Sequence, residues 1–415
     1  MIQYRISLVI MAVALVVTMA VYPFILRFAR RHGILDNPNA RKLQRAPVPV
    51  MGGATVMVGV LVAMILCYII TGDARVMKIL LMLAVMFLLG FWDDLKDVSA
   101  TFRFIAEIVV IWLIMLLLDV EINNLHGLWG IREIPDIVAI PLSIITGVGI
   151  INAVNMIDGV DGYCSSFGIM SCLAFALVFY LVSDKVMVTI AIIGIGAMIP
   201  FFFHNVFGAS SKMFLGDGGS LMLGTLLTVF TFTTLSSNSA CARYDRAGLS
   251  LVALTLAIMA VPVFDTLKVM CYRIARNRSP FQPDKTHLHH LFIDMNYSHL
   301  ATSATIVLYN FLIFVVLVVA WFSRVPKEWQ VYIVVFMALM FTWVFYFAME
   351  WDQRKMDRPG FHLFRWISER HKIRNASQTA IWLFIRRVVD SKALSGKSQE
   401  EGSEEQKRPK IDPRV

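Results

Sequence analysis

Long apolar stretches separated by short polar segments fill the chain up to residue 351. Eleven of these stretches have the roughly 20 residues that an α-helix needs to cross the hydrocarbon core of a bilayer. Their predicted bounds are 4–26, 50–71, 76–92, 102–119, 137–155, 164–182, 186–203, 219–236, 248–271, 300–322 and 330–350. Because a lone strand cannot satisfy its backbone groups in lipid, the pattern predicts an all-α polytopic integral membrane protein.

Composition supports this class. The 415 residues are 58% hydrophobic and only 16% charged, whereas soluble domains carry about 25% charged residues. Five cysteines are scattered without the paired spacing of a disulfide framework or a zinc site. The net charge of +9 is concentrated at the C-terminus, because 15 of the 38 Lys and Arg residues lie beyond Trp351. We expect this basic tail to meet anionic lipid headgroups or water, and we expect no nucleic-acid partner.

The chain divides into a membrane domain, 1–351, and a cytoplasmic tail, 352–415. Within the tail, an apolar and aromatic stretch followed by Arg386 and Arg387 predicts an amphipathic helix at about 377–390. From Ser391 onward the residues are polar, charged and without periodicity, which predicts disorder.

The basic residues of the short loops predict the orientation. The densest clusters follow the first and the ninth apolar stretches, and loops rich in Lys and Arg face the cytoplasm. This assignment makes the N-terminus periplasmic. It also brings three aspartate-bearing segments and a histidine-rich loop to the cytoplasmic face, where we predict the active site.

The first aspartate segment is the pair Asp93 and Asp94, at the end of the third apolar stretch. Adjacent carboxylates repel each other and are costly to hold near hydrocarbon. A divalent cation with phosphate oxygens on its other side would explain them. The alternative is a solvated acidic helix end balanced by Lys96 and Arg103.

In the second segment, Asn152, Asn155, Asp158 and Asp161 recur every three residues. This spacing predicts a polar stripe along one slowly turning helix face, and the glycines that follow the two aspartates would let a ligand approach the backbone. The alternative is a stripe that serves helix packing.

The third segment surrounds Asp217 with glycines and comes directly before an apolar stretch. Such a turn predicts an anion or metal cradle with exposed backbone N–H groups at a helix start. A plain glycine-rich turn capped by Ser220 is the alternative. Asn205 lies on the same side of the membrane in the predicted topology.

The histidine-rich loop carries Lys285, His287, His289 and His290. Its spacing lacks the second ligand group of a zinc site. Imidazoles next to a lysine suit the binding and neutralisation of a pyrophosphate or of the adjoining sugar. A solvated histidine-rich loop is the alternative.

These segments, in this order, resemble the polyprenyl-phosphate N-acetylhexosamine-1-phosphate transferases over residues 30–300. The matching pieces are Asp36-Asn-Pro-Asn-Ala-Arg41-Lys42, Pro47-Val-Pro-Val-Met-Gly52-Gly53, Asp93-Asp94, Asn155-Met-Ile-Asp158-Gly-Val-Asp161-Gly162, Phe214-Leu-Gly-Asp217-Gly-Gly-Ser220 and His287-Leu-His-His290. The last of them is similar to the branch that uses UDP-N-acetylglucosamine and starts enterobacterial common antigen and O-antigen lipopolysaccharide. One departure is Gln44, where relatives often have histidine.

The resemblance implies transfer of N-acetylglucosamine 1-phosphate from UDP-GlcNAc to undecaprenyl phosphate in a bacterial inner membrane, with release of UMP. It implies Mg²⁺ as cofactor, with Mn²⁺ as the alternative. It leaves open another UDP-N-acetylhexosamine as substrate, direct attack or a covalent aspartyl intermediate, and a homodimer.

Residue roles follow from the same resemblance. Asp217 is the first choice for a metal ligand, followed by Asp93 and Asp94, and Asp94 could instead orient or deprotonate the acceptor phosphate. Asp158, Asp161 and Asn155 would hold the nucleotide or the water shell of the metal, and Phe214 would stack on uracil. The pyrophosphate would be bound by His287, His289, His290 and Lys285. Arg41 and Lys42 are candidates for phosphate contacts, and Asn205 is a candidate for substrate binding.

Two other classes fit the pattern less well. A proton-coupled transporter would place its carboxylates near the bilayer midplane and often shows inverted repeats, whereas here the carboxylates lie at helix ends on one side. A membrane scaffold has no need of metal-binding carboxylates.

Overall fold

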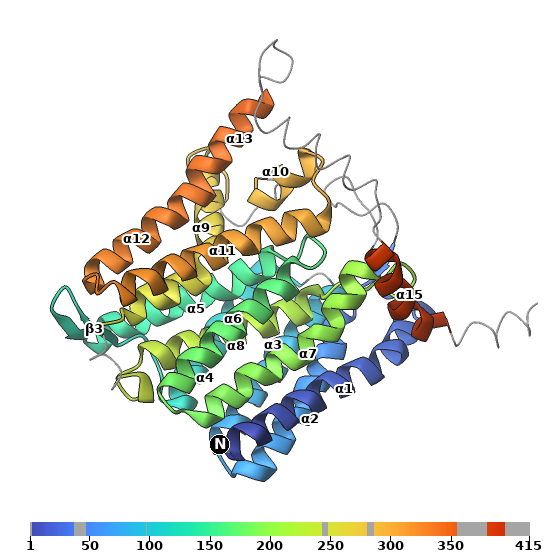
Figure 1. The fold of residues 1–415 in the computed structure, drawn as a ribbon, viewed down its shortest axis with the longest axis horizontal. Coiled ribbons are helices and arrows are strands. Elements are labelled where there is room, and N and C mark those ends of the chain that lie inside the picture. Colours follow the sequence, from blue (N-terminus) through green and yellow to red (C-terminus); the bar gives the residue numbers. More distant parts are fainter. Residues whose placement is uncertain are drawn as a thin grey trace, which may run out of the picture.

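The protein is described here by a computed structural model that covers residues 2–36, 47–96, 98–242, 248–279, 286–354 and 380–394. Eleven helices in these ranges are long and apolar enough to cross a membrane, which confirms the predicted all-α polytopic fold. The helices run side by side, and the start of the chain lies at the opposite end of the bundle from α15 (Figure 1).

Ten of the spans are single helices: α1 (Ile2–Arg31), α2 (Gly52–Thr71), α3 (Ala74–Lys96), α4 (Ala100–Leu118), α5 (Asp136–Met156), α6 (Tyr163–Leu181), α7 (Lys185–Phe207), α8 (Gly216–Leu235), α9 (Leu251–Ile274) and α11 (His299–Phe322). The eleventh joins α12 (Lys327–Leu339), the π-helical turn η2 (Met340–Val344) and α13 (Phe345–Arg354). The shorter helices are α10 (Leu288–Asp294) and α15 (Ala380–Leu394). Within the described ranges, β1 (Leu35–Asp36) pairs antiparallel with β2 (Val48–Pro49), and β3 (Asn124–Leu128) pairs antiparallel with β4 (Ile131–Glu133).

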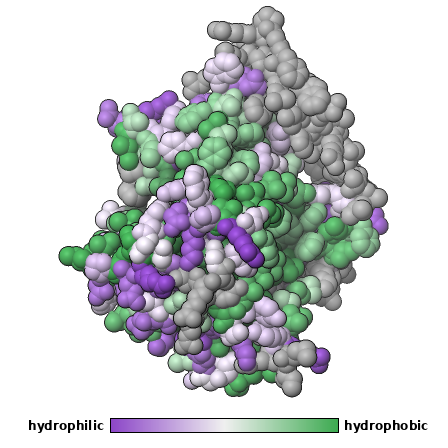
Figure 2. Space-filling view, turned by 60° about the vertical axis from the view of Figure 1, so that its left-hand side comes forward, coloured by the Kyte–Doolittle hydropathy of each residue, from purple (hydrophilic) through white to green (hydrophobic). Residues whose placement is uncertain are grey.

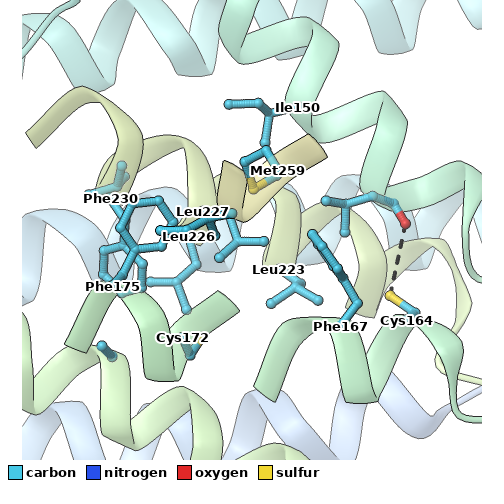
Figure 3. Close-up of a cluster of buried hydrophobic side chains, with 14 of the residues drawn as sticks. Ile150, Cys164, Phe167, Cys172, Phe175, Leu223, Leu226, Leu227, Phe230 and Met259 are labelled. Atoms are coloured by element: carbon cyan, nitrogen blue, oxygen red, sulfur yellow. Dashed lines mark hydrogen bonds between the residues drawn. The ribbon is translucent and has the colours of Figure 1, made fainter. Parts of the chain in front are cut away.

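Helix α8 forms the centre of the bundle, and its most apolar stretch of 18 residues is completely buried. It packs between α3 and α5, and its leucine and phenylalanine side chains meet Phe167 and Phe175 of α6 (Figure 3). Four of the five threonine hydroxyls of α8 donate to carbonyl oxygens four residues earlier in the same helix, as Thr225 does to Leu221, and Thr231 is the exception. Most of the polar side chains of this helix are therefore satisfied by its own backbone, and none needs contact with lipid.

The outer helices carry the surface that the bilayer would cover. In the most apolar 18-residue stretches of α1, α4 and α11, only 22%, 22% and 28% of the residues are buried. Large apolar side chains such as Phe24, Leu116 and Val319 are more than half exposed. Green, hydrophobic residues cover the flanks of the molecule beside a gathering of purple, hydrophilic ones (Figure 2).

Helix α9 contains Pro262, and Asn310 of α11 compensates for the hydrogen bond that this proline removes. Proline has no N–H to donate to the carbonyl four residues earlier, which is that of Ile258. The Asn310 Nδ2 group donates to the Ile258 oxygen at 2.9 Å and to the Ala257 oxygen at 3.1 Å, and its Oδ1 accepts from Val261 N at 2.9 Å. The second half of α9 is thereby held in place by a polar side chain buried between two helices.

We expect Asn310→Leu to destabilise the protein by about 1–2 kcal/mol, because it removes these buried hydrogen bonds. Adding Pro262→Ala should recover part of the loss, since the substituted residue regains an N–H for the Ile258 carbonyl. The measurement is thermal unfolding in detergent, with Leu308→Ala on the exposed side of α11 as control. Equal melting temperatures for the single and the double variant would contradict this account.

Candidate active site

The start of α2 fixes the loop that leads into α8. Phe214 N donates to the Pro49 oxygen at 2.9 Å. Gly52 N and Gly53 N donate to the oxygens of Phe214 and Leu215, both at 2.8 Å. The Pro47–Gly53 segment and the segment around Asp217, far apart in the sequence, are therefore one structural unit.

Two aspartates from other segments bind the N-terminus of α8. Asp94 accepts from Asp217 N at 2.9 Å and from Gly218 N at 3.1 Å, and Asp158 accepts from Gly216 N at 3.0 Å. Carboxylates are favoured at this positive end of a helix. The prediction that these backbone N–H groups are exposed for an anion is therefore wrong, because the protein's own carboxylates occupy them.

Glycine is required at position 216 for two reasons. Its φ of +77° is a left-handed conformation that costs side chains free energy. A Cβ there would also lie 2.6 Å from Asp94 Oδ2. At Gly90 of α3 a Cβ would clash with the Asp217 backbone, so the small residue lets α3 bring Asp94 against α8.

The Asp217 side chain is oriented by an amide that is itself held by an arginine. Asn155 Nδ2 donates to Asp217 Oδ1 and also, at 2.9 Å, to Ser220 Oγ. Arg103 Nη2 donates to Asn155 Oδ1 at 2.7 Å. Asn155 therefore presents its donor side to the carboxylate of Asp217.

The predicted continuous stripe from Asn152 to Asp161 is wrong beyond α5. The helix ends at Met156, and Asp158 and Asp161 lie in turns before Gly162, whose φ is +79°. Glycine breaks the helix here, so the two aspartates reach the site from a loop. Asn152 stays on the helix and donates to Glu107 Oε2 of α4.

Asp93 is turned away from its neighbour Asp94. It accepts from Val98 N at 2.8 Å, and Arg103 Nη1 lies 3.4 Å from its other oxygen. These contacts tie the end of α3 to the start of α4. The two neighbours on α3 therefore have different partners: Asp93 contacts the α3–α4 loop and α4, and Asp94 contacts the N-terminus of α8.

Burial raises the pKa of Asp158 well above its ordinary value, and the negative charge of Asp217 adds to this effect. Burial also acts to raise the pKa of Asp161. There the hydrogen bonds and charges of His299, 3.0 Å away, and of Lys212, at 2.6 Å, outweigh it and lower the pKa. Asp161 is thus held ionised, whereas ionisation of Asp158 would require a further positive charge beside it.

A cavity of about 750 Å³ brings most of the predicted residues together. Its lining includes Asp93, Asp94, Asn155, Asp158, Asp161, Asn205, Phe214, Asp217 and His290. The half-buried Phe214 ring has Lys212 Nζ 5.6 Å from its centroid. Asn205 is buried and has both polar ends occupied, by Gly162 N at 2.6 Å and the Met213 oxygen at 2.8 Å. Its structural role is to join two loops of the site.

The histidine segment is anchored by Asp265 of α9. His287 Nδ1 lies 2.9 Å from Asp265 Oδ2, and Lys268 Nζ and Leu288 N donate to Oδ1 at 2.7 and 3.1 Å. His289 stacks nearly parallel to His287, and burial lowers its pKa well below the ordinary value. His289 is therefore a neutral imidazole and a hydrogen-bonding group rather than a charge.

A second cavity, of about 510 Å³, adjoins the first and shares Asp93, Asn155 and His290 with it. Its lining adds His287 and His289 and three charged groups, Arg103, Glu107 and Arg273. A cavity of about 550 Å³ elsewhere, lined by Arg75 and Asp184, contains none of the predicted residues.

Arg103 is predicted from the sequence only as a charge that could balance Asp93 and Asp94. Several other residues around the two cavities escape the motif analysis: Glu107, Lys212, Asp265, Lys268, Arg273 and His299. Glu107 and Asp265 sit inside apolar stretches. An ionisable residue within a predicted span is itself a signal of function, and it would have identified both.

The carboxylates suit a divalent cation that is completed by substrate. Among the described residues, no group of three or more His, Cys, Asp or Glu forms a ready-made metal site. Mg²⁺, however, is usually held by one or two carboxylates plus phosphate oxygens and water. Asp94, Asp158 and Asp217 line one cavity, and the buried Asp161 Oδ1 has no hydrogen-bond partner among the described residues. These carboxylate oxygens, which have too little positive charge around them, fit Mg²⁺.

Arg41, Lys42 and Lys285, and with them Gln44, lie outside the described residues. Their roles stay predictions.

Comparison with known proteins gives consistent matches. The family model "Glycosyl transferase family 4" matches residues 76–235. The "Probable undecaprenyl-phosphate N-acetylglucosaminyl 1-phosphate transferase" of Bacillus subtilis is 28% identical over 301 residues, 72% of this chain and 81% of the relative. The "Decaprenyl-phosphate N-acetylglucosaminephosphotransferase" of Mycolicibacterium smegmatis is 30% identical over 292 residues, 65% and 71% of the two chains. The "Undecaprenyl-phosphate alpha-N-acetylglucosaminyl 1-phosphate transferase" of Escherichia coli is 27% identical over 342 residues, 79% and 87%.

These relatives confirm the resemblance found in the ordered motifs, and the matched region of the family model contains Asp93, Asp94, Asn155, Asp158, Asp161, Asn205, Phe214 and Asp217. The chain therefore belongs to glycosyl transferase family 4, among the polyprenyl-phosphate N-acetylhexosamine-1-phosphate transferases.

Proposed function

We propose that this protein transfers N-acetylglucosamine 1-phosphate from UDP-GlcNAc to undecaprenyl phosphate and releases UMP. The observation that carries the proposal is the cavity in which Asp94, Asp158 and Asp217 meet at the ends of spanning helices. A lipid phosphate enters a site at this depth from the bilayer, while a nucleotide sugar enters from water. The relatives from Bacillus subtilis and Escherichia coli carry the names of this activity.

The reaction joins two anionic partners. An oxygen of the acceptor phosphate attacks the phosphorus that bears the sugar, the bond from that phosphorus to UMP breaks, and UMP leaves with the bonding electrons. Mg²⁺, when bound, would offset the repulsion between these phosphates. Asp217 is the first candidate to hold it, and Asp94 and Asp158 complete the donor set.

The chain's own residues do the positioning. Asn155 orients the Asp217 carboxylate, and Asp94 fixes the start of α8. Because both oxygens of Asp94 accept backbone hydrogen bonds, they are poor nucleophiles, which supports direct attack over an aspartyl intermediate at this residue. The acceptor phosphate is already ionised at neutral pH, so no strong base is required.

The remaining residues would bind the donor. Phe214 offers a ring for uracil at the cavity wall. His290 faces both cavities, where it can donate to the pyrophosphate as negative charge develops. His287, oriented by Asp265, and the neutral His289 line the adjoining cavity.

We further infer a bacterial inner-membrane location with the site facing the cytoplasm. The basic residues that follow α1 and α9 support this orientation. Both helices end on the side of the bundle where α3 and α5 bring Asp94 and Asn155 to the site. The product would then start an O-antigen or enterobacterial common antigen type of glycan.

The test is a transfer assay with purified protein, Mg²⁺, undecaprenyl phosphate and UDP-GlcNAc, UDP-GalNAc or UDP-glucose. We expect UMP and a lipid-linked sugar from UDP-GlcNAc, and loss of both with EDTA or without the acceptor. No UMP from any donor would refute the proposal, whereas release from another UDP-N-acetylhexosamine alone would correct the sugar.

A further inference from the structure

Helix α15 (Ala380–Leu394) lies at the end of the bundle that contains the candidate active site. It packs on the last turn of α7, where the Trp382 and Phe207 rings lie 4.7 Å apart between centroids. Figure 1 shows it in red beside the ends of α1 and α7. The motifs of the transferase family do not include this segment, so its role needs a separate explanation.

Asp390 attaches α15 to the loop that follows α7. Its carboxylate accepts from Ala209 N at 3.2 Å, from Ser211 N at 3.0 Å and from Ser211 Oγ at 2.9 Å. Burial acts to raise the pKa of Asp390, but these hydrogen bonds outweigh it and hold the pKa below the ordinary value. The attachment is therefore an ionised carboxylate that receives several donors from one short loop.

The same loop, 208–213, reaches the site. Tyr22 OH donates to the Ser211 oxygen at 2.8 Å and Asn205 Nδ2 to the Met213 oxygen at 2.8 Å. Between these two anchors Lys212 Nζ donates to Asp161 Oδ2 at 2.6 Å. The contact with Asp390 at Ser211 is thus directly followed in the chain by the contact of Lys212 with a carboxylate that lines the candidate cavity.

Three apolar side chains of α15 are exposed on the outside of the bundle. Leu383, Phe384 and Val388 are 46%, 67% and 50% exposed. This surface continues onto α7 through Trp382, Phe207 and Phe203, since the last two rings stack at 5.7 Å and Phe203 is itself 39% exposed. An apolar face next to the end of a spanning helix, with Arg387 exposed beside it, suits a bilayer surface with anionic headgroups.

We propose that α15 is a strap on the membrane surface, with its apolar face among lipids, and that Asp390 positions loop 208–213 so that Lys212 stays against Asp161. Asp390 is a positioning residue, because it acts through the loop and lines neither cavity of the site. This inference rests on the proposed function, since it concerns the binding of the UDP-sugar in that site.

The first test compares Asp390→Ala, Asp390→Asn and Ser391→Ala in the full-length protein. We expect Asp390→Ala to raise KM for UDP-GlcNAc about tenfold, as the loss of hydrogen bonds to a charged group would, with a much smaller change in kcat. Asp390→Asn keeps an accepting oxygen and should recover part of KM. Ser391→Ala, an exposed neighbour, should match the wild type. An unchanged KM in Asp390→Ala, with an active wild type, overturns the positioning role without touching the proposed function.

The second test locates the apolar face. Cys271 is the exposed cysteine and the other four are buried, so Phe384→Cys in a Cys271→Ser background can be labelled with a fluorophore. In vesicles containing anionic lipid, a nitroxide on the lipid chains should quench the label at position 384 more strongly than one at Asn277→Cys, which is exposed in the loop after α9. Quenching at 384 by aqueous iodide alone would show that the face is in water and would overturn the membrane contact.

Discussion

Replacing Asp217 by asparagine is expected to lower the transfer rate about 10³-fold, because the site loses its first metal-binding carboxylate. The same change should raise the melting temperature measured without Mg²⁺. Asp217 lies with Asp94 and Asp158 around one cavity, and removal of one negative charge relieves their mutual repulsion. Asparagine keeps the shape and the backbone N–H that Asp94 accepts. Opposite effects on activity and stability are the signature of a functional charge.

The measurement is a pair of Mg²⁺ titrations, one of transfer rate and one of melting temperature. Wild-type protein should gain stability as Mg²⁺ binds, whereas Asp217→Asn should not. Asp119→Asn is the matched control. This aspartate follows the last residue of α4, at the end of that helix that is remote from the candidate site, and it contacts Asn238. Full activity with unchanged Mg²⁺ dependence in Asp217→Asn would show that the metal is held elsewhere.

Asp265→Asn is expected to lower the rate about 100-fold, with a smaller effect on KM for the UDP-sugar. Asp265 accepts hydrogen bonds from His287 Nδ1 and from Lys268 Nζ. Because Nδ1 of His287 is engaged in this way, Nε2 is the ring nitrogen left to act on the substrate. An amide can present its NH₂ to Nδ1 and reverse the tautomer of the imidazole, the kind of change that disables a carboxylate–histidine pair elsewhere.

A double variant separates this effect from destabilisation. Asp265→Asn removes the carboxylate partner of the buried Lys268, which costs stability. Adding Lys268→Met should restore the melting temperature while the rate stays low. If the double variant recovers the rate as well, Asp265 acts only on folding and does not orient His287 for the reaction.

The spans were predictable because membrane crossing depends on length and apolarity, which are local properties. Their ends were less so. The third apolar stretch stops at Trp92, yet α3 continues to Lys96, since a helix at the membrane surface can extend into polar residues. The opposite error occurs in the second segment, where the predicted helical stripe runs to Asp161 but α5 ends at Met156.

The tertiary partners of the site were not predictable from local patterns. Asp94 is 123 residues from the backbone N–H of Asp217 that it binds, and no sequence period indicates such a contact. The segments themselves were found because aspartates at apolar boundaries are costly without a function. The buried partners Glu107 and Asp265 were missed because they lie within apolar stretches, whereas the motifs lie in loops and at helix ends.

The central position of α8 also bears on how the protein is made. Its four Gly, one Ser and five Thr residues give it the lowest hydropathy of the eleven spans, so it partitions weakly from the translocon into lipid. Its neighbours α3 and α5 precede it in the chain and are synthesised first. We expect α8 to enter the membrane by docking between them, so that assembly of the site is coupled to insertion of the helix that carries Asp217.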